Sequence, residues 1–127
     1  MDIKAFKRVV KALSALALMA NTSMQEDRGN IDAAIHRFEL TMDLFEKLLR
    51  DLLETKGVLV QYPKDVLREA YRGHLIDDEK TWLSMLQDRA LTSHAYDEKL
   101  ADQIYKHIKT YVPVFQRTYN NLAKQFI

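Results

Sequence analysis

Apolar positions recur along most of this chain with the spacing of amphipathic helices. Between residues 31 and 52 they are separated alternately by four and three residues, the period of helices that pack side by side in a bundle. This row consists of Ile31, Ile35, Phe38, Met42, Phe45, Leu49 and Leu52. A second row with the same spacing consists of Ala101, Tyr105, Ile108, Val112, Phe115, Tyr119, Leu122 and Phe126. The pattern predicts two long helices.

Glycine and proline indicate where the helices end or bend. The first long helix should end near Gly57, because glycine readily takes the left-handed conformation of a helix C-terminus. A short helix is expected from Pro63 to Gly73, with the proline in its first turn. Pro113 lies within the second long helix and predicts a kink between Lys109 and Pro113.

Two further helices are expected from shorter patterns. The segment after Ile76 opens on acids and should turn Trp82, Met85 and Leu86 inward. The N-terminal segment resembles a signal peptide in outline, but its amphipathic spacing favours a helix of the mature protein. Its expected apolar face is Ile3, Phe6, Val10, Leu13 and Ala17, and its basic face is Lys4, Lys7, Arg8 and Lys11.

These elements predict an all-α fold, an antiparallel four-helix bundle in which the short helix at 63–73 is an extra connection. A length of 127 residues indicates one domain spanning 1–127. The absence of cysteine excludes disulfides and fits a cytoplasmic location. The apolar run at 12–20 is too short to span a bilayer, so we predict no membrane partner. A net charge of +1 means that any nucleic-acid binding must be local.

The sequence lacks the common signatures of metal and hydrolase sites. A di-metal carboxylate bundle needs Glu-x-x-His motifs, whereas His36 precedes Glu39 here. Glu39, Asp43 and Glu46 are therefore interpreted as a solvated helix face. No glycine-rich phosphate loop occurs, and we predict neither a metal nor a cofactor.

The segment from 88 to 100 concentrates groups suited to phosphodiester chemistry. Arg89 offers a permanently charged fork for phosphate oxygens, and His94 can exchange a proton near neutral pH. Five residues apart on an unbroken helix, they would lie about 140° from each other around the axis. They converge only if the helix frays at 92–93 or if two copies meet across a twofold axis. The other histidines, His36, His74 and His107, are interpreted as hydrogen-bonded or solvent-edge side chains.

The stretches "IHRFELTMDLFEKLLRDLLETKG" and "PKDVLREAYRGHLIDDEKTWLSMLQDRALTSHAYDE" carry a family resemblance. They resemble the HEPN proteins encoded beside minimal nucleotidyltransferases, also described as nucleotidyltransferase substrate-binding proteins or HepT-type toxins. The resemblance runs from about Ile31 to Tyr111. It is most specific at Arg89, His94 and Tyr96, which match that family's R-x-x-x-x-H-x-Y motif.

The resemblance implies a homodimeric four-helix bundle that acts as a metal-independent ribonuclease toxin on an RNA substrate. Arg89 and His94 would be its catalytic residues, in a cleft at the dimer interface. The implied partner is a nucleotidyltransferase antitoxin that transfers AMP to Tyr96. A non-catalytic subunit that binds a nucleotide or presents a substrate to its nucleotidyltransferase is the alternative. Ala90 favours that alternative, because many active HEPN nucleases carry a polar residue after the motif arginine.

Overall fold

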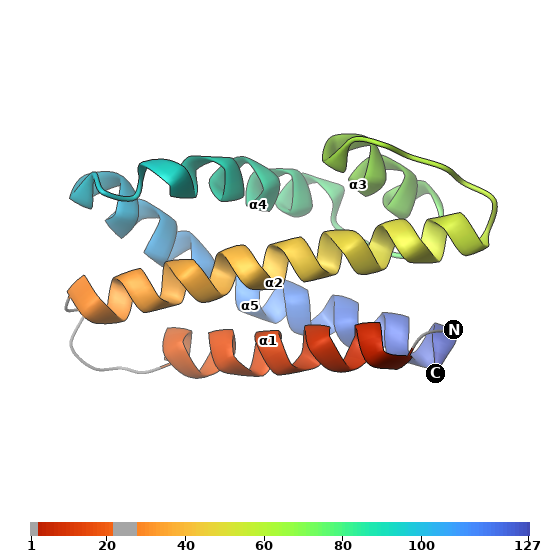
Figure 1. Ribbon diagram of the computed structural model, residues 1–127, viewed down its shortest axis with the longest axis horizontal. Coiled ribbons are helices and arrows are strands. Elements are labelled where there is room, and N and C mark those ends of the chain that lie inside the picture. The colour runs from red at the N-terminus through yellow and green to blue at the C-terminus, as the bar shows by residue number, and fades with distance from the viewer. Residues whose placement is uncertain (1–2, 22–27) are drawn as a thin grey trace.

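The computed structural model describes residues 3–21 and 28–127, and this part of the chain consists of helices joined by short connections. They are α1 (Ile3–Asn21), α2 (Arg28–Thr55), α3 (Pro63–Arg72), α4 (Glu79–Leu91), the 3₁₀ turn η1 (Thr92–His94) and α5 (Glu98–Phe126). The four longer helices form the bundle, and α3 connects α2 to α4 (Figure 1). The predicted all-α, four-helix fold with a short connecting helix is confirmed.

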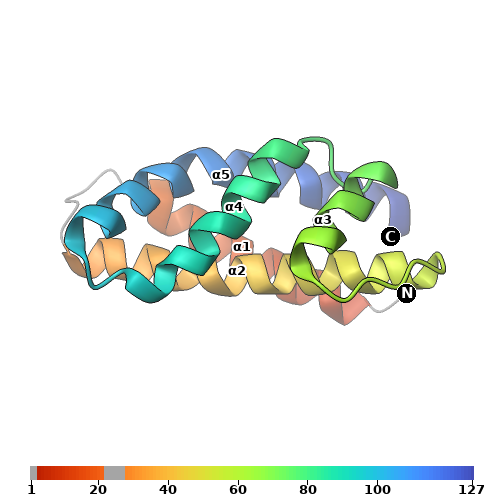
Figure 2. The ribbon, with the colours of Figure 1, turned by 90° about the horizontal axis from the view of Figure 1, so that it is seen from above.

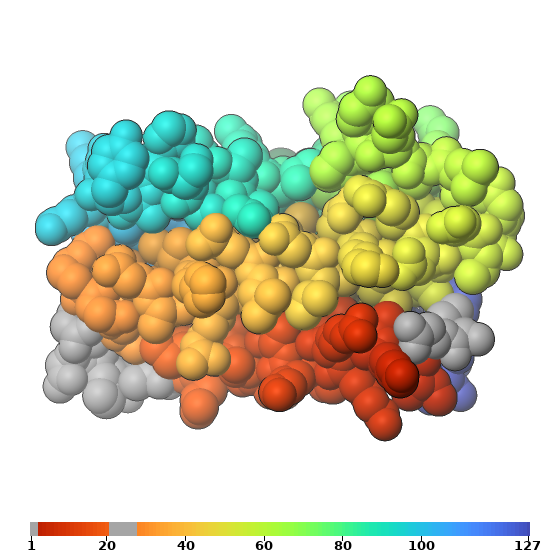
Figure 3. All heavy atoms as spheres, in the orientation of Figure 1, coloured from red at the N-terminus to blue at the C-terminus, as the bar shows by residue number. Residues whose placement is uncertain are grey.

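The long helix α2 lies between two groups of helices. Seen from one side, α1 lies along one flank of α2, and α3 and α4 lie along the other, with α5 behind (Figures 1 and 3). From above, α4 crosses the bundle obliquely (Figure 2). The N-terminus of α4 lies near α5, and the C-terminus of α4 lies near α2. The end of α4 therefore faces both long helices.

The core contains the two predicted rows of apolar side chains. All seven members of the first row are buried, and six of the second, with Tyr119 and Phe126 packed at the core's edge. Trp82 packs edge-on against Phe45 and Phe115, with both pairs of ring centroids 5.4 Å apart. Phe45 and Phe115 are themselves stacked at 5.0 Å. Aromatic burial thus joins α2, α4 and α5, because large rings supply much of the apolar area that a small domain can bury.

The apolar face of α1 differs from the expected one by part of a turn. Val9 is buried, whereas Val10 is only half-buried and Ile3 is 52% exposed. The buried face of α1 is Phe6, Val9, Ala12, Leu13, Leu16 and Ala20. Helical periodicity alone could not choose between Val9 and Val10, because either residue fits the spacing of the other apolar positions to within one residue. The four basic residues of α1 are exposed as predicted.

The helix ends follow local chemistry. Gly57 has φ of +82°, the left-handed conformation expected after α2. After α3, Gly73 has φ of −85° and the next residue, His74, has the left-handed φ of 61°. The helix therefore ends at Gly73, but it is His74 that takes the left-handed conformation. Asp78 caps α4 by accepting from the backbone N–H of Thr81 at 3.0 Å.

Pro113 lies inside α5, which continues through it to Phe126. The predicted kink at this proline stays a prediction. None of the described helices combines the length and apolar character needed to cross a membrane.

Candidate functional site

The motif residues lie where α4 gives way to α5. The α-helix ends at Leu91, one 3₁₀ turn continues to His94, and α5 begins at Glu98. Two local hydrogen bonds favour this ending, because the hydroxyl of Thr92 donates to the carbonyl of Arg89 (2.7 Å) and that of Ser93 to Ala90 (3.2 Å). The α-helix therefore gives way to a 3₁₀ turn at 92–93. A break in the helix at this point was one of the two conditions under which Arg89 and His94 were expected to converge.

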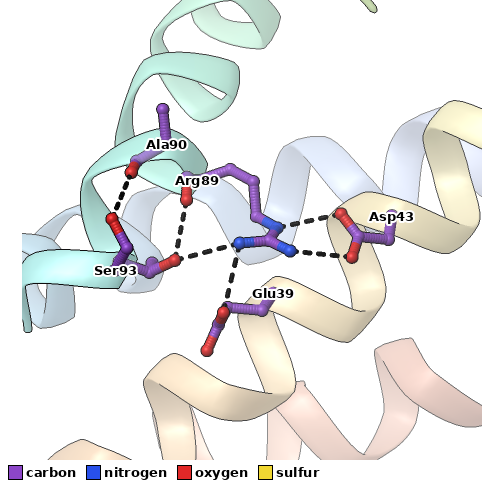
Figure 4. Close-up of polar contacts among 6 residues, drawn as sticks. Glu39, Asp43, Arg89, Ala90 and Ser93 are labelled. Carbon is purple, nitrogen blue, oxygen red and sulfur yellow. Dashed lines mark hydrogen bonds and ion pairs between the residues drawn. The ribbon is translucent and has the colours of Figure 1, made fainter.

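Arg89 turns toward α2 and is held there by two carboxylates (Figure 4). Its Nε and Nη2 each donate to Asp43 at 2.9 Å in a bidentate pair, and Nη1 donates to Glu39 at 3.1 Å. Nη1 also donates to the hydroxyl of Thr92 at 3.1 Å. The hydrogen bonds to Asp43 raise the pKa of Arg89, so this side chain is permanently charged. Of the three acids interpreted as a solvated face, Glu39 and Asp43 are therefore ion-pair partners of the motif arginine. The third, Glu46, pairs with Arg50, and its side chain is only 15% exposed.

His94 and Tyr96 lie together on the turn and face solvent. Their ring centroids are 6.1 Å apart at an interplanar angle of 69°, an edge-on arrangement. Tyr96 is 82% exposed, and Asp97 caps α5 by accepting from the backbone N–H groups of Lys99 and Leu100. Among the described residues no hydrogen bond joins Arg89 to either side chain. One chain therefore brings His94 and Tyr96 together and leaves Arg89 among the acids of α2.

A shallow groove borders Arg89 on the outer face of α4. It has a volume of about 470 Å³ and is lined by α2, the start of α3 and α4. Figure 3 shows this side of the molecule, hollowed between the atoms of α3 and those of α4. Its apolar lining includes Tyr62, Pro63, Leu86 and Ala90, and Tyr62 is 63% exposed. The groove thus leaves apolar surface open to solvent directly beside the motif arginine.

A second polar cluster lies on another side of α4 and was missed by the sequence analysis. Asp88 is only 7% exposed, and its Oδ2 accepts from the hydroxyl of Tyr111 at 2.5 Å and contacts Nδ1 of His107 at 2.8 Å. Burial, then the hydrogen bond to this carboxylate, raises the pKa of Tyr111 well above its usual range. The four-residue spacing of His107 and Tyr111 places both on one face of α5, and that spacing was the available signal.

The described residues contain no group of three histidine or carboxylate side chains placed to bind a metal ion. Three acids near the motif already have partners, since Asp43 binds Arg89, Asp88 binds Tyr111, and Asp97 caps α5. The imidazole of His94 can exchange protons, and a guanidinium such as that of Arg89 can stabilise negative charge.

Comparison with known proteins agrees with the sequence resemblance. The family model described as "Nucleotidyltransferase substrate binding protein like" matches residues 2–124. A curated relative, the "Probable ribonuclease HepT" of Haemophilus influenzae, is 33% identical over 87 residues. That alignment covers 65% of this chain and 60% of the relative. This chain therefore spans less than two thirds of the relative's length.

Two solved structures share the fold. A protein from Thermus thermophilus superposes with a TM-score of 0.83 at 33% identity, covering 90% of this chain and 98% of that one. A protein from Haemophilus influenzae superposes with a TM-score of 0.67 at 26% identity, covering 94% of this chain and 95% of that one. The second is described as revealing the fold of a substrate binding domain of a nucleotidyltransferase.

Proposed function

Since the chain belongs to the HepT-like family of nucleotidyltransferase substrate-binding proteins, we propose that it is a metal-independent ribonuclease toxin paired with a minimal nucleotidyltransferase. The observation that carries the proposal is the exposed pair of His94 and Tyr96 on the turn after α4. An imidazole that is open to solvent at a helix junction can contact a phosphodiester, whereas a buried imidazole could not.

His94 would act as a general acid or base. In the reaction, the ribose 2′-oxygen forms a bond to phosphorus as its proton leaves, and the bond from phosphorus to the 5′-oxygen breaks as that oxygen gains a proton. One imidazole can accept the first proton or deliver the second. A symmetric homodimer would supply both, with one His94 from each copy, and an arginine would stabilise the charge that develops on the phosphoryl oxygens.

Dimerisation is supported by the groove beside Arg89. The groove presents apolar surface from exposed Tyr62 and Ala90 and from half-buried Leu86. A second copy covers surface of this kind in a homodimer, whose interface is more apolar than the remaining surface. A twofold axis near this face would place the two turns that carry His94 on one surface. Sedimentation should find a dimer at micromolar concentration, and Leu86→Glu should yield a folded monomer. A wild-type protein that is monomeric there would contradict the composite site.

Tyr96 is the proposed acceptor of AMP from the partner enzyme. Its phenolic oxygen would form a bond to the α-phosphorus of ATP and lose its proton as pyrophosphate leaves. The 82% exposure of this side chain supports the proposal, because a partner's active site must reach the oxygen. The added phosphate would lie next to His94 and obstruct an RNA phosphate by charge and bulk.

The adenylylation test is intact-mass spectrometry after incubation with ATP, magnesium and the nucleotidyltransferase. We expect an AMP adduct on the wild type, none on Tyr96→Phe, and an unchanged adduct on Tyr71→Phe, which alters another exposed tyrosine. An adduct that persists on Tyr96→Phe would contradict the assignment.

A non-catalytic substrate-binding subunit is the second candidate. The observation that favours it is the engagement of every guanidinium nitrogen of Arg89 by Asp43, Glu39 or Thr92. A phosphate would have to compete with these carboxylates for the guanidinium. Ala90, which offers no polar group beside it, favours the same candidate.

Cleavage of RNA in the presence of EDTA distinguishes the two candidates. If the protein is a nuclease, His94→Gln should slow cleavage by about 10²-fold or more, and His36→Gln, at another exposed histidine, should have no effect. Asp43→Asn then separates the structural role of Arg89, its ion pair with α2, from a role in stabilising phosphate charge. The variant weakens the ion pair and keeps the arginine. Cleavage should persist in Asp43→Asn and fail in Arg89→Ala if the guanidinium acts on phosphate. A folded dimer without EDTA-resistant cleavage would favour the binding subunit.

A further inference from the structure

His107 is an imidazole with one nitrogen fixed and the other open. Its Nδ1 lies 2.8 Å from Oδ2 of Asp88, and that carboxylate is itself fixed by the hydroxyl of Tyr111. A carboxylate at Nδ1 selects the tautomer that donates from this nitrogen, and it orients the ring. Nε2 makes no hydrogen bond to any described residue, and the side chain is 54% exposed. The ring is therefore presented to solvent in a defined orientation.

His107 forms part of the wall of a cavity of about 670 Å³ between α4 and α5. This volume is within the range of small-molecule sites, about 300 to 1,000 Å³. It is larger than the groove beside Arg89 and lies on another face of α4, because Asp88 and Arg89 are consecutive and their side chains diverge by about 100°.

The lining of this cavity changes along its length. The helices run in opposite directions (Figure 1), and the contacts of Asp88 with α5 set their register. One end has an ammonium group and hydroxyls from Lys80, Thr81, Ser84 and Thr110. The other end, toward the turn with the motif, has amides and apolar side chains from Gln87, Leu91, Leu100 and Gln103. His107 lies between the two ends.

The charges of the lining favour an anion. Among the residues that line the cavity, Asp88 is the single acid, and its carboxylate is buried and bonded to Tyr111 and His107. Lys80 is exposed and contributes a positive charge, and the neighbouring hydroxyls can donate to phosphate oxygens. An anionic ligand would therefore meet donors without a free carboxylate to repel it.

We propose that the α4–α5 cavity is a binding site for a phosphate ester of the size of a nucleoside monophosphate. The phosphate is bound at the end with Lys80 and Ser84 and accepts a hydrogen bond from Nε2 of protonated His107. The base packs on Leu91 and Leu100, where the amides of Gln87 and Gln103 can pair with its polar edge. The site is separate from Arg89 and His94, and the inference does not depend on ribonuclease activity.

The test uses the imidazole as its own reporter. The chain has four histidines, so their ring signals can be resolved by NMR and assigned by substitution of each with glutamine. AMP should shift the His107 signals saturably and leave those of His36 in place. Adenosine should give no saturable shift, and inorganic phosphate should bind several-fold more weakly than AMP. The His94→Gln variant should bind AMP like the wild type.

Matched variants test the proposed contacts. Lys80→Ala should weaken AMP binding several-fold, whereas Lys124→Ala, which removes the same charge from the last turn of α5, should not. Asp88→Asn should also weaken it; if this variant is unfolded, the lysine pair decides alone, since Lys80 and Lys124 are exposed. The proposal is overturned if AMP leaves His107 unmoved, shifts all four histidines in parallel, binds no better than adenosine, or is insensitive to Lys80→Ala.

Discussion

Replacing Tyr111 with phenylalanine removes a buried hydroxyl from a buried carboxylate. The hydroxyl donates to Asp88 at 2.5 Å, and in the variant Asp88 keeps His107 as its remaining partner. A hydrogen bond to a charged group contributes about 1.5 to 3 kcal/mol, so we expect Tyr111→Phe to lower the free energy of unfolding by that amount at neutral pH. For a domain of this size, the melting temperature should fall by roughly 5 to 12 °C.

The penalty should depend on pH with a defined sign. Burial and the bond to Asp88 raise the pKa of Tyr111 in the folded state, so the folded chain keeps a proton that the unfolded chain loses above about pH 10. The stabilisation is complete below this unfolded-state pKa and is lost as the pH rises beyond it, at up to about 1.4 kcal/mol per pH unit. Phenylalanine has no such proton. The difference between wild type and Tyr111→Phe should therefore narrow at alkaline pH.

The measurement is urea unfolding followed by far-UV circular dichroism, at a series of pH values from about 7 to about 11, which spans the tyrosine pKa. Groups that do not contact Tyr111 or Asp88 contribute equally in both proteins, so the change in the difference above pH 10 reports on Tyr111. Tyr96→Phe is the matched control, and its exposed ring should change stability by less than about 0.5 kcal/mol. A difference for Tyr111→Phe that is equally small at neutral pH, or that does not narrow above pH 10, would refute this account.

Three further experiments test local contacts by thermal or urea unfolding. A double-mutant cycle of Arg89→Ala and Asp43→Ala should give a coupling of about 0.5 to 1 kcal/mol that weakens in high salt, since Asp43 is 56% exposed; additive effects would contradict the pair. Gly57→Ala should cost about 1 to 2 kcal/mol, because φ of +82° strains any L-residue, and an unchanged stability would exclude that strain. Asp97→Ala should cost about 1 kcal/mol through the lost cap of α5, with no loss if solvent replaces the cap.

The sequence predicted the parts of the fold that depend on local spacing. The rows on α2 and α5 have an unbroken apolar period, and burial follows that period almost residue by residue. The cap at Asp97 and the exposure of Tyr96 were also predictable, because both depend on where one helix stops and the next begins. Domain extent and the roles of Arg89 and His94 stay predictions.

The partners of Arg89 could not be predicted in this way. Asp43 lies 46 residues earlier, and the pairing depends on the angle at which α4 crosses α2. The residues of α4 give little guidance to that angle. Trp82 and Met85 are buried, but Leu83 and Leu86 lie on flanking faces and are only partly buried, so no single stripe fixes the rotation of the helix. Tertiary packing of the aromatic cluster sets it instead.

That rotation accounts for how an exposed turn can keep a defined position. Asp88 and Arg89 are consecutive, so their side chains diverge by about 100° around the axis of α4. Because α4 lies across both long helices at this point, Asp88 reaches α5 and Arg89 reaches α2. The last turn of α4 is thereby bonded to both long helices immediately before His94. The turn itself makes few bonds that a substrate or partner would have to break. Its placement comes from residues that precede the exposed histidine and tyrosine. Substitutions at Asp88, which contacts His107 and Tyr111, should therefore act on His94 and Tyr96 through position rather than through contact.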